Sequence, residues 1–106
     1  MAPINLEKLR EVTEGDAALE RQLFMLYFDT AERCLASLKT QIHVDDGATW
    51  KNAAHELKGA SANIQAGKIA ELCKFSEHLP ADEEERERTC QLIEEGLAEI
   101  RAFLKL

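Results

Sequence analysis

Apolar residues recur every three or four positions through most of the chain, which is the spacing typical of amphipathic helices. The longest such run extends from Asp16 to about Ile42, and charged residues fill positions between the apolar ones. No segment alternates apolar and polar residues in the manner of a strand. The run predicts one long helix whose buried positions are Leu19, Leu23, Tyr27, Ala31, Cys34, Leu38 and Ile42.

Turn and capping residues predict a helix on each side of this long one. A short helix from Asn5 to about Val12 ends before Gly15-Asp16, which supplies a C′ glycine and the N-cap of the long helix. Asp45-Asp46-Gly47 predicts a turn and the N-cap of a third helix, and Gln65-Ala66-Gly67 interrupts that helix. Its expected buried positions are Trp50, Ala53, Leu57, Ala60 and Ile64.

Pro80 and Asp82 separate a fourth helix from a fifth. Proline disfavours helical geometry in the residue before it, so the fourth helix is expected to stop at Pro80. Asp82 precedes Glu85 by three residues, as in a capping box, and the run from Asp82 to Arg88 is expected to be a solvated helix start. The expected buried positions are Ile69, Leu72, Cys73, Ser76 and Leu79 in the fourth helix, and Leu92 or Ile93, Leu97, Ile100 and Leu104 in the fifth.

Four long helices joined by short connections predict an all-α fold, an antiparallel up-down four-helix bundle with a short additional N-terminal helix that caps one end. The 106 residues suit a single domain, and no internal repeat or flexible linker divides them. A hydrophobic fraction of 45% excludes a disordered chain. The net charge of −7 argues against nucleic acid as the main partner.

The N-terminal sequence, the lengths of the apolar runs and the cysteines indicate the cellular compartment. The N-terminal sequence lacks the features of a signal peptide, and no apolar run approaches the roughly 18 residues of a membrane span. We therefore expect a cytoplasmic protein without membrane insertion. Cys34, Cys73 and Cys90 are odd in number and have no C-x-x-C spacing, so they predict neither a disulfide framework nor a zinc site. They are expected to act as small hydrophobes.

One face of the third helix carries candidate chemistry. At 100° per residue, His55 falls opposite the apolar stripe of that helix and therefore points outward. Residues 47–70 hold three lysines against Glu56 alone, a local charge of +2, whereas the rest of the chain carries 10 basic and 19 acidic residues. This basic island is suited to an anion. The residues predicted to share the outward face with His55 are Lys51, Asn52, Lys58, Gly59 and Ala62.

These residue types fit the transfer of a phosphoryl group. An accessible imidazole with a pKa of about 6.5 is largely the free base at neutral pH, and it is a competent nucleophile toward an activated phosphoryl group. Lys58, one turn on, can offset the added charge. Glycine in the middle of a helix lowers stability by roughly 1 kcal/mol relative to alanine. A need for clearance, so that another group can approach the helix closely, would explain why Gly59 is present. His43 and His78 lie at helix ends, where a structural role is expected.

The segment Ala54-His55-Glu56-Leu57-Lys58-Gly59-Ala60-Ser61-Ala62-Asn63-Ile64 closely resembles the signature of the histidine-containing phosphotransfer (HPt) domain family. The order of elements resembles that family over nearly the whole chain, so residues 1–106 are interpreted as a single HPt-like domain. The resemblance implies that His55 is the phosphorylation site, that Lys58 supports the phosphoryl group and that Gly59 gives clearance. One departure is Gln65, where the family usually has glycine, which puts the end of the helix in question.

The resemblance also implies partners. His55 would accept a phosphoryl group from the aspartate of a response-regulator receiver domain, linked to a hybrid sensor histidine kinase, and pass it to another receiver. The chain has no nucleotide-binding loop, so we expect a carrier, not an enzyme, with no intrinsic cofactor and Mg²⁺ on the partner receiver. A monomer is expected. The sequence leaves open whether the protein stands alone or is a domain of a larger kinase.

Two questions about surfaces and function stay open at this stage. Met25 and Phe28 lie away from the stripe of the long helix, so they form a docking patch, or the short first helix covers them, or both hold. Ser61 points to the side of the bundle and is expected to bond a helical carbonyl or a neighbouring helix. The alternative function is a helical adaptor that binds a receiver without carrying phosphate. Metal binding through His55 with Cys73 or Cys90 fails on spacing.

Overall fold

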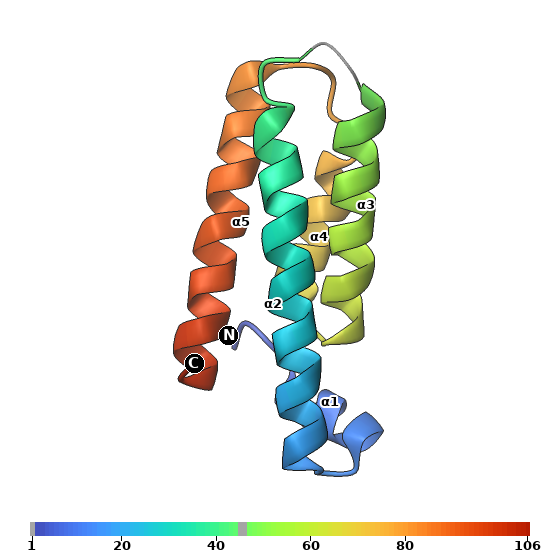
Figure 1. Ribbon diagram of the computed structural model, residues 1–106, viewed down its shortest axis with the longest axis vertical. Coiled ribbons are helices and arrows are strands. Elements are labelled where there is room, and N and C mark those ends of the chain that lie inside the picture. The colour runs from blue at the N-terminus through green and yellow to red at the C-terminus, as the bar shows by residue number, and fades with distance from the viewer. Residues whose placement is uncertain (1, 45–46) are drawn as a thin grey trace.

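Four helices stand side by side in the bundle, each antiparallel to the one before it (Figure 1). The short helix that precedes these four in the chain lies at the lower end in that view, beside the first turns of the first bundle helix. The computed structural model describes residues 2–44 and 47–106, and no strand occurs in those ranges. The predicted all-α up-down bundle is confirmed. In chain order the helices are α1 (Leu6–Thr13), α2 (Ala17–Thr40), α3 (Gly47–Asn63), α4 (Gly67–Ser76) and α5 (Glu83–Leu104).

Predicted capping side chains begin three of the helices. The side-chain oxygen of Asn5 accepts the backbone N–H three residues further on at 3.1 Å, at the start of α1. Asp16 and Asp82 do the same for α2 and α5, each at 3.0 Å. Each cap satisfies a helical N–H that has no partner within the helix, which is worth about 1 kcal/mol. The turn and N-cap predicted at Asp45-Asp46 lie outside the described residues, and α3 begins at Gly47.

The end of α4 differs from the prediction. We expected the helix to include Leu79 and stop at Pro80, but it ends at Ser76. Pro80 still explains the end, because proline has no N–H to donate to the Ser76 carbonyl four residues earlier. Instead that carbonyl accepts the indole N–H of Trp50 at 2.8 Å and the backbone N–H of Leu79 at 3.0 Å. A buried side chain of α3 thus takes the place of the missing helical donor.

The core lies between α2, α3, α4 and α5, and most predicted positions line it. One prediction for α2 is wrong: Leu19 is exposed, and the neighbouring Glu20 is buried and pairs with Arg10 of α1 at 3.1 Å. The first turns of α2 extend beyond the other bundle helices and lie beside α1, so the face that is buried there differs from the stripe predicted for the bundle (Figure 1). In α5, Ile93 is buried and Leu92 is not.

The predicted solvated start of α5 also needs correction at Arg86. This side chain is fully buried, although the other charged residues from Asp82 to Arg88 are exposed. Its guanidinium lies 4.8 Å from the centre of the Trp50 ring and donates to the carbonyls of Gln41 at 2.6 Å and Val44 at 3.0 Å. Arg86 therefore fastens the end of α2 to α5. Its role depends on backbone groups far away in the sequence, which no helical periodicity reveals.

The turn between α3 and α4 shows how the chain accommodates glutamine at position 65. Gln65 has φ of 65°, in the left-handed region that favours glycine. Its N–H bonds the Ala62 carbonyl at 3.1 Å, and the N–H of Ala66 bonds the Ser61 carbonyl at 2.8 Å. These two bonds define a Schellman motif with Gln65 at C′. The helix therefore stops where the family pattern would stop it, and a non-glycine residue bears the left-handed conformation.

We predict that Gln65→Gly raises the free energy of unfolding by about 0.5 to 1 kcal/mol, because glycine adopts this conformation without strain. Urea unfolding followed by circular dichroism measures the change. Gln91→Gly is the matched control, since Gln91 is an exposed residue inside α5. That control should lose about 1 kcal/mol. A loss of stability in both variants would contradict the account of this turn.

Candidate functional site

His55 lies on the outward face of α3, as predicted. Its side chain is 68% exposed, whereas Leu57, two residues further on, is fully buried. The structure confirms the geometry of this face, on which the other predicted members are exposed or partly exposed. Those members are Lys51, Asn52, Lys58, Gly59 and Ala62.

The residue that completes the site comes from another helix and was not predicted. Glu77 is the C-cap residue of α4, and its side chain is only 8% exposed. One carboxylate oxygen, Oε2, lies 3.2 Å from Nδ1 of His55. The other, Oε1, accepts a hydrogen bond from Nζ of Lys58 at 3.3 Å. The antiparallel packing of α4 on α3 brings these residues together, and no spacing in the sequence signals it.

The charge state of Glu77 decides which nitrogen of His55 is free. Burial by itself raises the pKa of the Glu77 carboxyl, but the hydrogen bonds and positive charge of His55 and Lys58 outweigh burial and hold that pKa below its ordinary value. An ionised carboxylate can only accept, so Nδ1 of His55 carries the proton and donates. The lone pair of the neutral imidazole is then on Nε2, which faces away from Glu77.

Lys58 is less outward than predicted. Its side chain is 28% exposed, because it leans toward α4 to meet Glu77. The basic island is also less basic in the folded protein, since Glu77 joins it and Lys68 pairs with Glu99 at 3.5 Å. Glu56 turns the other way and forms an ion pair with Arg33 of α2. Lys58 remains one helical turn from His55, on a flexible stem.

Gly59 leaves an open surface beside His55. A Cβ atom at this position would have no heavy atom within 4 Å outside its own helix and chain neighbours. Nothing inside the molecule therefore requires glycine here. Gly96 in α5 is different, because a Cβ there would lie 3.0 Å from Cγ1 of Ile69. The comparison indicates that any need for glycine at position 59 arises from something that approaches the surface.

The hydroxyl of Ser61 bonds a neighbouring helix inside the core, as expected. Its hydroxyl lies 2.9 Å from the Tyr27 hydroxyl, and both side chains are buried between α2 and α3. Burial raises the pKa of Tyr27 to about 12, so this hydroxyl stays protonated at neutral pH. The pair is a structural hydrogen bond beneath the site.

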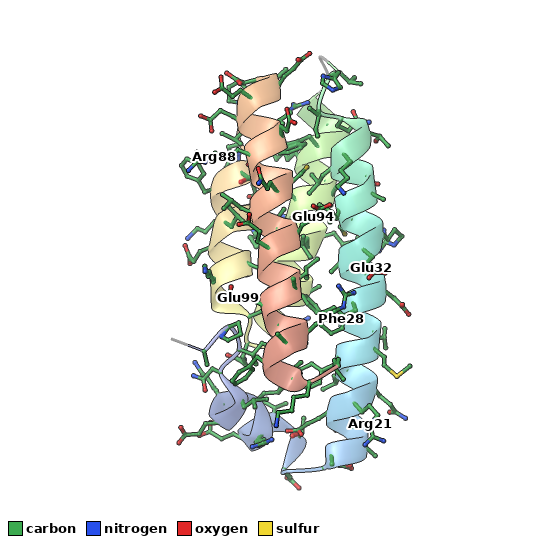
Figure 2. All side chains as sticks on the ribbon, turned by 90° about the vertical axis from the view of Figure 1, so that its left-hand side faces the viewer. Arg21, Phe28, Glu32, Arg88, Glu94 and Glu99 are labelled. Carbon is green, nitrogen blue, oxygen red and sulfur yellow. The ribbon has the colours of Figure 1, made fainter. Side chains whose placement is uncertain are left out.

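The predicted docking patch is only half right. Met25 is 64% exposed, but Phe28 is buried, so Phe28 is not part of an exposed surface. Phe28 lies at the boundary between α2 and α5, as Figure 2 shows, with the guanidinium of Arg101 stacked 4.4 Å from its ring centre. Arg101 of α5 thus covers part of this ring. Leu26 is exposed beside Met25 and was missed, although its place off the predicted stripe could have revealed it.

The other two histidines differ in their surroundings. His43 lies 3.1 Å from Glu83 at the start of α5, and both side chains are exposed. His78 follows Glu77 directly, and its Nε2 lies 3.3 Å from Oε1 of that carboxylate. His78 is therefore part of the charged cluster around Glu77, a role that its place at a helix end did not predict.

The cysteines are buried, and their thiols are protonated at neutral pH. Burial raises the pKa of the thiols to about 11 for Cys34 and Cys90 and to about 12 for Cys73. They pack as small hydrophobes, as predicted. Within residues 2–44 and 47–106, no group of three or more metal-ligating side chains could hold a metal ion. None of the helices described is long and apolar enough to cross a membrane.

Comparison with known protein families identifies this fold. The family model of the Hpt domain matches residues 22–103, a span that runs from α2 to the last turn of α5. No curated protein and no solved structure matches the chain. The match includes the residues of α3 and α4 that form the site around Glu77.

We predict that Glu77 stabilises the fold in a pH-dependent way. Because its pKa is lowered in the folded protein, the ionised form stabilises above the unfolded value of about 4.3, and this contribution is lost as the pH falls through the folded value. Glu77→Gln should therefore be less stable than the wild type at pH 7, with a difference that shrinks toward pH 3. Urea unfolding at pH 7, 5 and 3 tests this. Glu71→Gln, which removes an exposed carboxylate of α4, should show little difference at any pH. A difference for Glu77→Gln that is constant with pH would contradict the assignment.

Proposed function

Because the chain belongs to the Hpt domain family, we propose that it carries a phosphoryl group on Nε2 of His55. Members of this family transfer phosphoryl groups through histidine in phosphorelays. The observation that supports His55 as the acceptor is its contact with Glu77, 3.2 Å from Nδ1, on an exposed face of α3. In the neutral imidazole this contact places the lone pair on the exposed Nε2, and a nucleophile needs such a lone pair.

The proposed step is a direct transfer between two side chains. The lone pair of Nε2 attacks the phosphorus of a phosphorylated aspartate, a bond forms between nitrogen and phosphorus, and the bond between phosphorus and the aspartate oxygen breaks. The aspartate leaves as a carboxylate, so no proton has to move. The imidazole keeps its proton on Nδ1 and becomes cationic, and the ionised Glu77 stabilises that charge.

Lys58 and the exposed surface have separate roles in this proposal. The ammonium of Lys58 lies one turn from His55 and can turn toward the phosphoryl oxygens, whose charge it offsets. Lys51, Asn52, Gly59, Ala62 and Met25 are exposed and form the surface that a partner covers. The Mg²⁺ that the chemistry of the aspartyl phosphate needs is expected on the partner.

The partners proposed are receiver domains of response regulators and a hybrid sensor kinase. A phosphoryl group on histidine can pass back to aspartate by the reverse of the same step, so one site serves a donor and an acceptor in turn. The chain itself has no phosphate-binding nucleotide loop, so we expect it to act as a carrier and to take its phosphoryl group from a partner protein.

We predict that wild-type protein incubated with phosphoramidate gains the mass of one phosphoryl group and that His55→Gln gains none. The adduct should be labile in acid, as expected of a phosphoramidate bond and not of a phosphate ester. Intact-mass spectrometry before and after acid treatment measures both. His55→Gln should fold normally, because the replaced side chain is largely exposed.

His43→Gln and His78→Gln are the matched controls for this experiment, since both replace exposed imidazoles next to glutamates. Each control should still accept one phosphoryl group. If His55→Gln keeps the adduct and a control loses it, the acceptor is another histidine. If the wild type accepts nothing from phosphoramidate or from phosphorylated receivers but binds a receiver, the protein is an adaptor.

Gly59→Ala tests the clearance at the partner surface. Alanine should raise the free energy of unfolding by up to about 1 kcal/mol, because glycine is the weaker helix former and the added methyl group meets nothing. Phosphorylation by phosphoramidate should be unchanged, whereas transfer to or from a receiver should slow at least several-fold. Stopped reactions analysed by mass give both rates. Normal transfer with the receiver would show that clearance is not the reason for glycine.

A further inference from the structure

Oxygen Oε1 of Glu77 has two nitrogen neighbours, one on a lysine and one on a histidine. Nζ of Lys58 and Nε2 of His78 each lie 3.3 Å from this oxygen, on α3 and just after α4 respectively. The second oxygen, Oε2, is already engaged by His55. The same carboxylate oxygen therefore lies within reach of one permanent cation and one cation that depends on a proton.

A phosphoryl group on His55 would change the balance among these charges. A phosphoryl group adds between one and two negative charges close to Lys58, and the flexible lysine stem allows its ammonium to turn toward them. Glu77 is 8% exposed, so water solvates its carboxylate poorly once Lys58 leaves. A poorly solvated carboxylate without a cationic partner is costly.

We propose that His78 is a positioning residue that takes a proton from solvent and holds the Glu77 carboxylate when Lys58 turns to the phosphoryl group on His55. This inference rests on the proposed function. His78 keeps Glu77 in place against Nδ1 of His55, so that the imidazole retains its orientation in the phosphorylated state. The 68% exposure of His78 gives it direct access to protons from water.

The other charged groups around this cluster come from α3 and α4. On α3 they are His55 and Lys58, which contact Glu77 directly. On α4, Glu71 and Lys74 line the same surface hollow as Lys58 and His78, and they carry opposite charges. Lys58 is therefore the one permanent cation in contact with Glu77 among the described residues. In the proposal, His78 gains a proton when Lys58 moves away.

This exchange links phosphorylation to proton binding. If the phosphoryl group raises the proton affinity of His78, a proton on His78 must favour the phosphorylated state by the same factor. The contribution of His78 to the phosphorylated state should therefore be larger at slightly acidic pH than at alkaline pH.

The test follows the ring protons of His78 by NMR as the pH is varied. In unphosphorylated Lys58→Ala, which imitates the departure of the lysine, the midpoint of the His78 titration should rise by roughly half a pH unit, about three-fold in proton affinity. The same rise should occur in wild-type protein phosphorylated with phosphoramidate. His78→Gln assigns the signals. His43, whose neighbour is Glu83, is the control and should not shift.

A double-mutant cycle with Glu77→Gln separates the proposed contact from simple loss of a positive charge. In the Glu77→Gln background, Lys58→Ala should shift the midpoint of His78 much less than in the wild-type background. Equal shifts in both backgrounds, or no shift on removal of Lys58, would overturn the proposal. The phosphorylated wild type needs no substitution, so a folding defect in a variant cannot hide the result.

Failure of this inference and failure of the proposed function give different results. If His55 accepts a phosphoryl group and His78 does not respond, the carrier function stands and the role of His78 fails. If His78 responds to Lys58→Ala but His55 accepts nothing from any donor, the charge cluster is real and the proposed function fails.

Discussion

The hydrogen bond from the Trp50 indole to the Ser76 carbonyl joins the inside of the bundle to its functional surface. It is 2.8 Å long and buried, and it closes α4 at the point where Pro80 removes the usual donor. Arg86 stacks on the same indole and holds the end of α2 through two carbonyls. The Trp50 side chain therefore connects four helices. Glu77 directly follows Ser76, whose carbonyl the indole holds in place. A buried polar contact of this kind is costly to break, because both groups would lose their partners without access to water.

The geometry of α3 makes this arrangement useful. Trp50 and His55 are five residues apart, which places them about 140° from each other around the helix. The helix can therefore anchor its first turns in the core and present the imidazole to solvent without any bend. Rigid support and full access are usually opposed, and here they occupy opposite faces of one element. The carboxylate of Glu77 then reaches the imidazole from the neighbouring helix and orients it, as a positioned second group does in many sites built on histidine.

Electrostatics separate the site from the rest of an acidic protein. The chain carries a net charge of −7, yet His55, Lys58 and His78 surround a single nearly buried carboxylate. Within this cluster the charges of Lys58 and Glu77 offset each other. Its cations are mobile, because lysine has a flexible stem and histidine can gain a proton. A phosphoryl group can therefore be accommodated by small movements of side chains, without repacking of the core.

The sequence alone determined the helices, their order and the outward face of α3, because periodicity and capping act over a few residues. Asn5, Asp16 and Asp82 cap their helices as predicted, and His55 points outward. The prediction failed where a residue contacts a partner that is distant in the sequence. Arg86 was expected in water and is buried on Trp50, and Glu77 was not predicted to belong to the site. The sequence left open whether Phe28 is exposed, and Arg101 of α5 covers it. Glu77 is 22 residues from His55, and only the packing of α4 against α3 sets the distance between them. The proposed acceptor could thus be named from one helix, whereas the group that orients it was decided by tertiary structure, because hydrogen bonds between helices depend on packing and leave no local pattern.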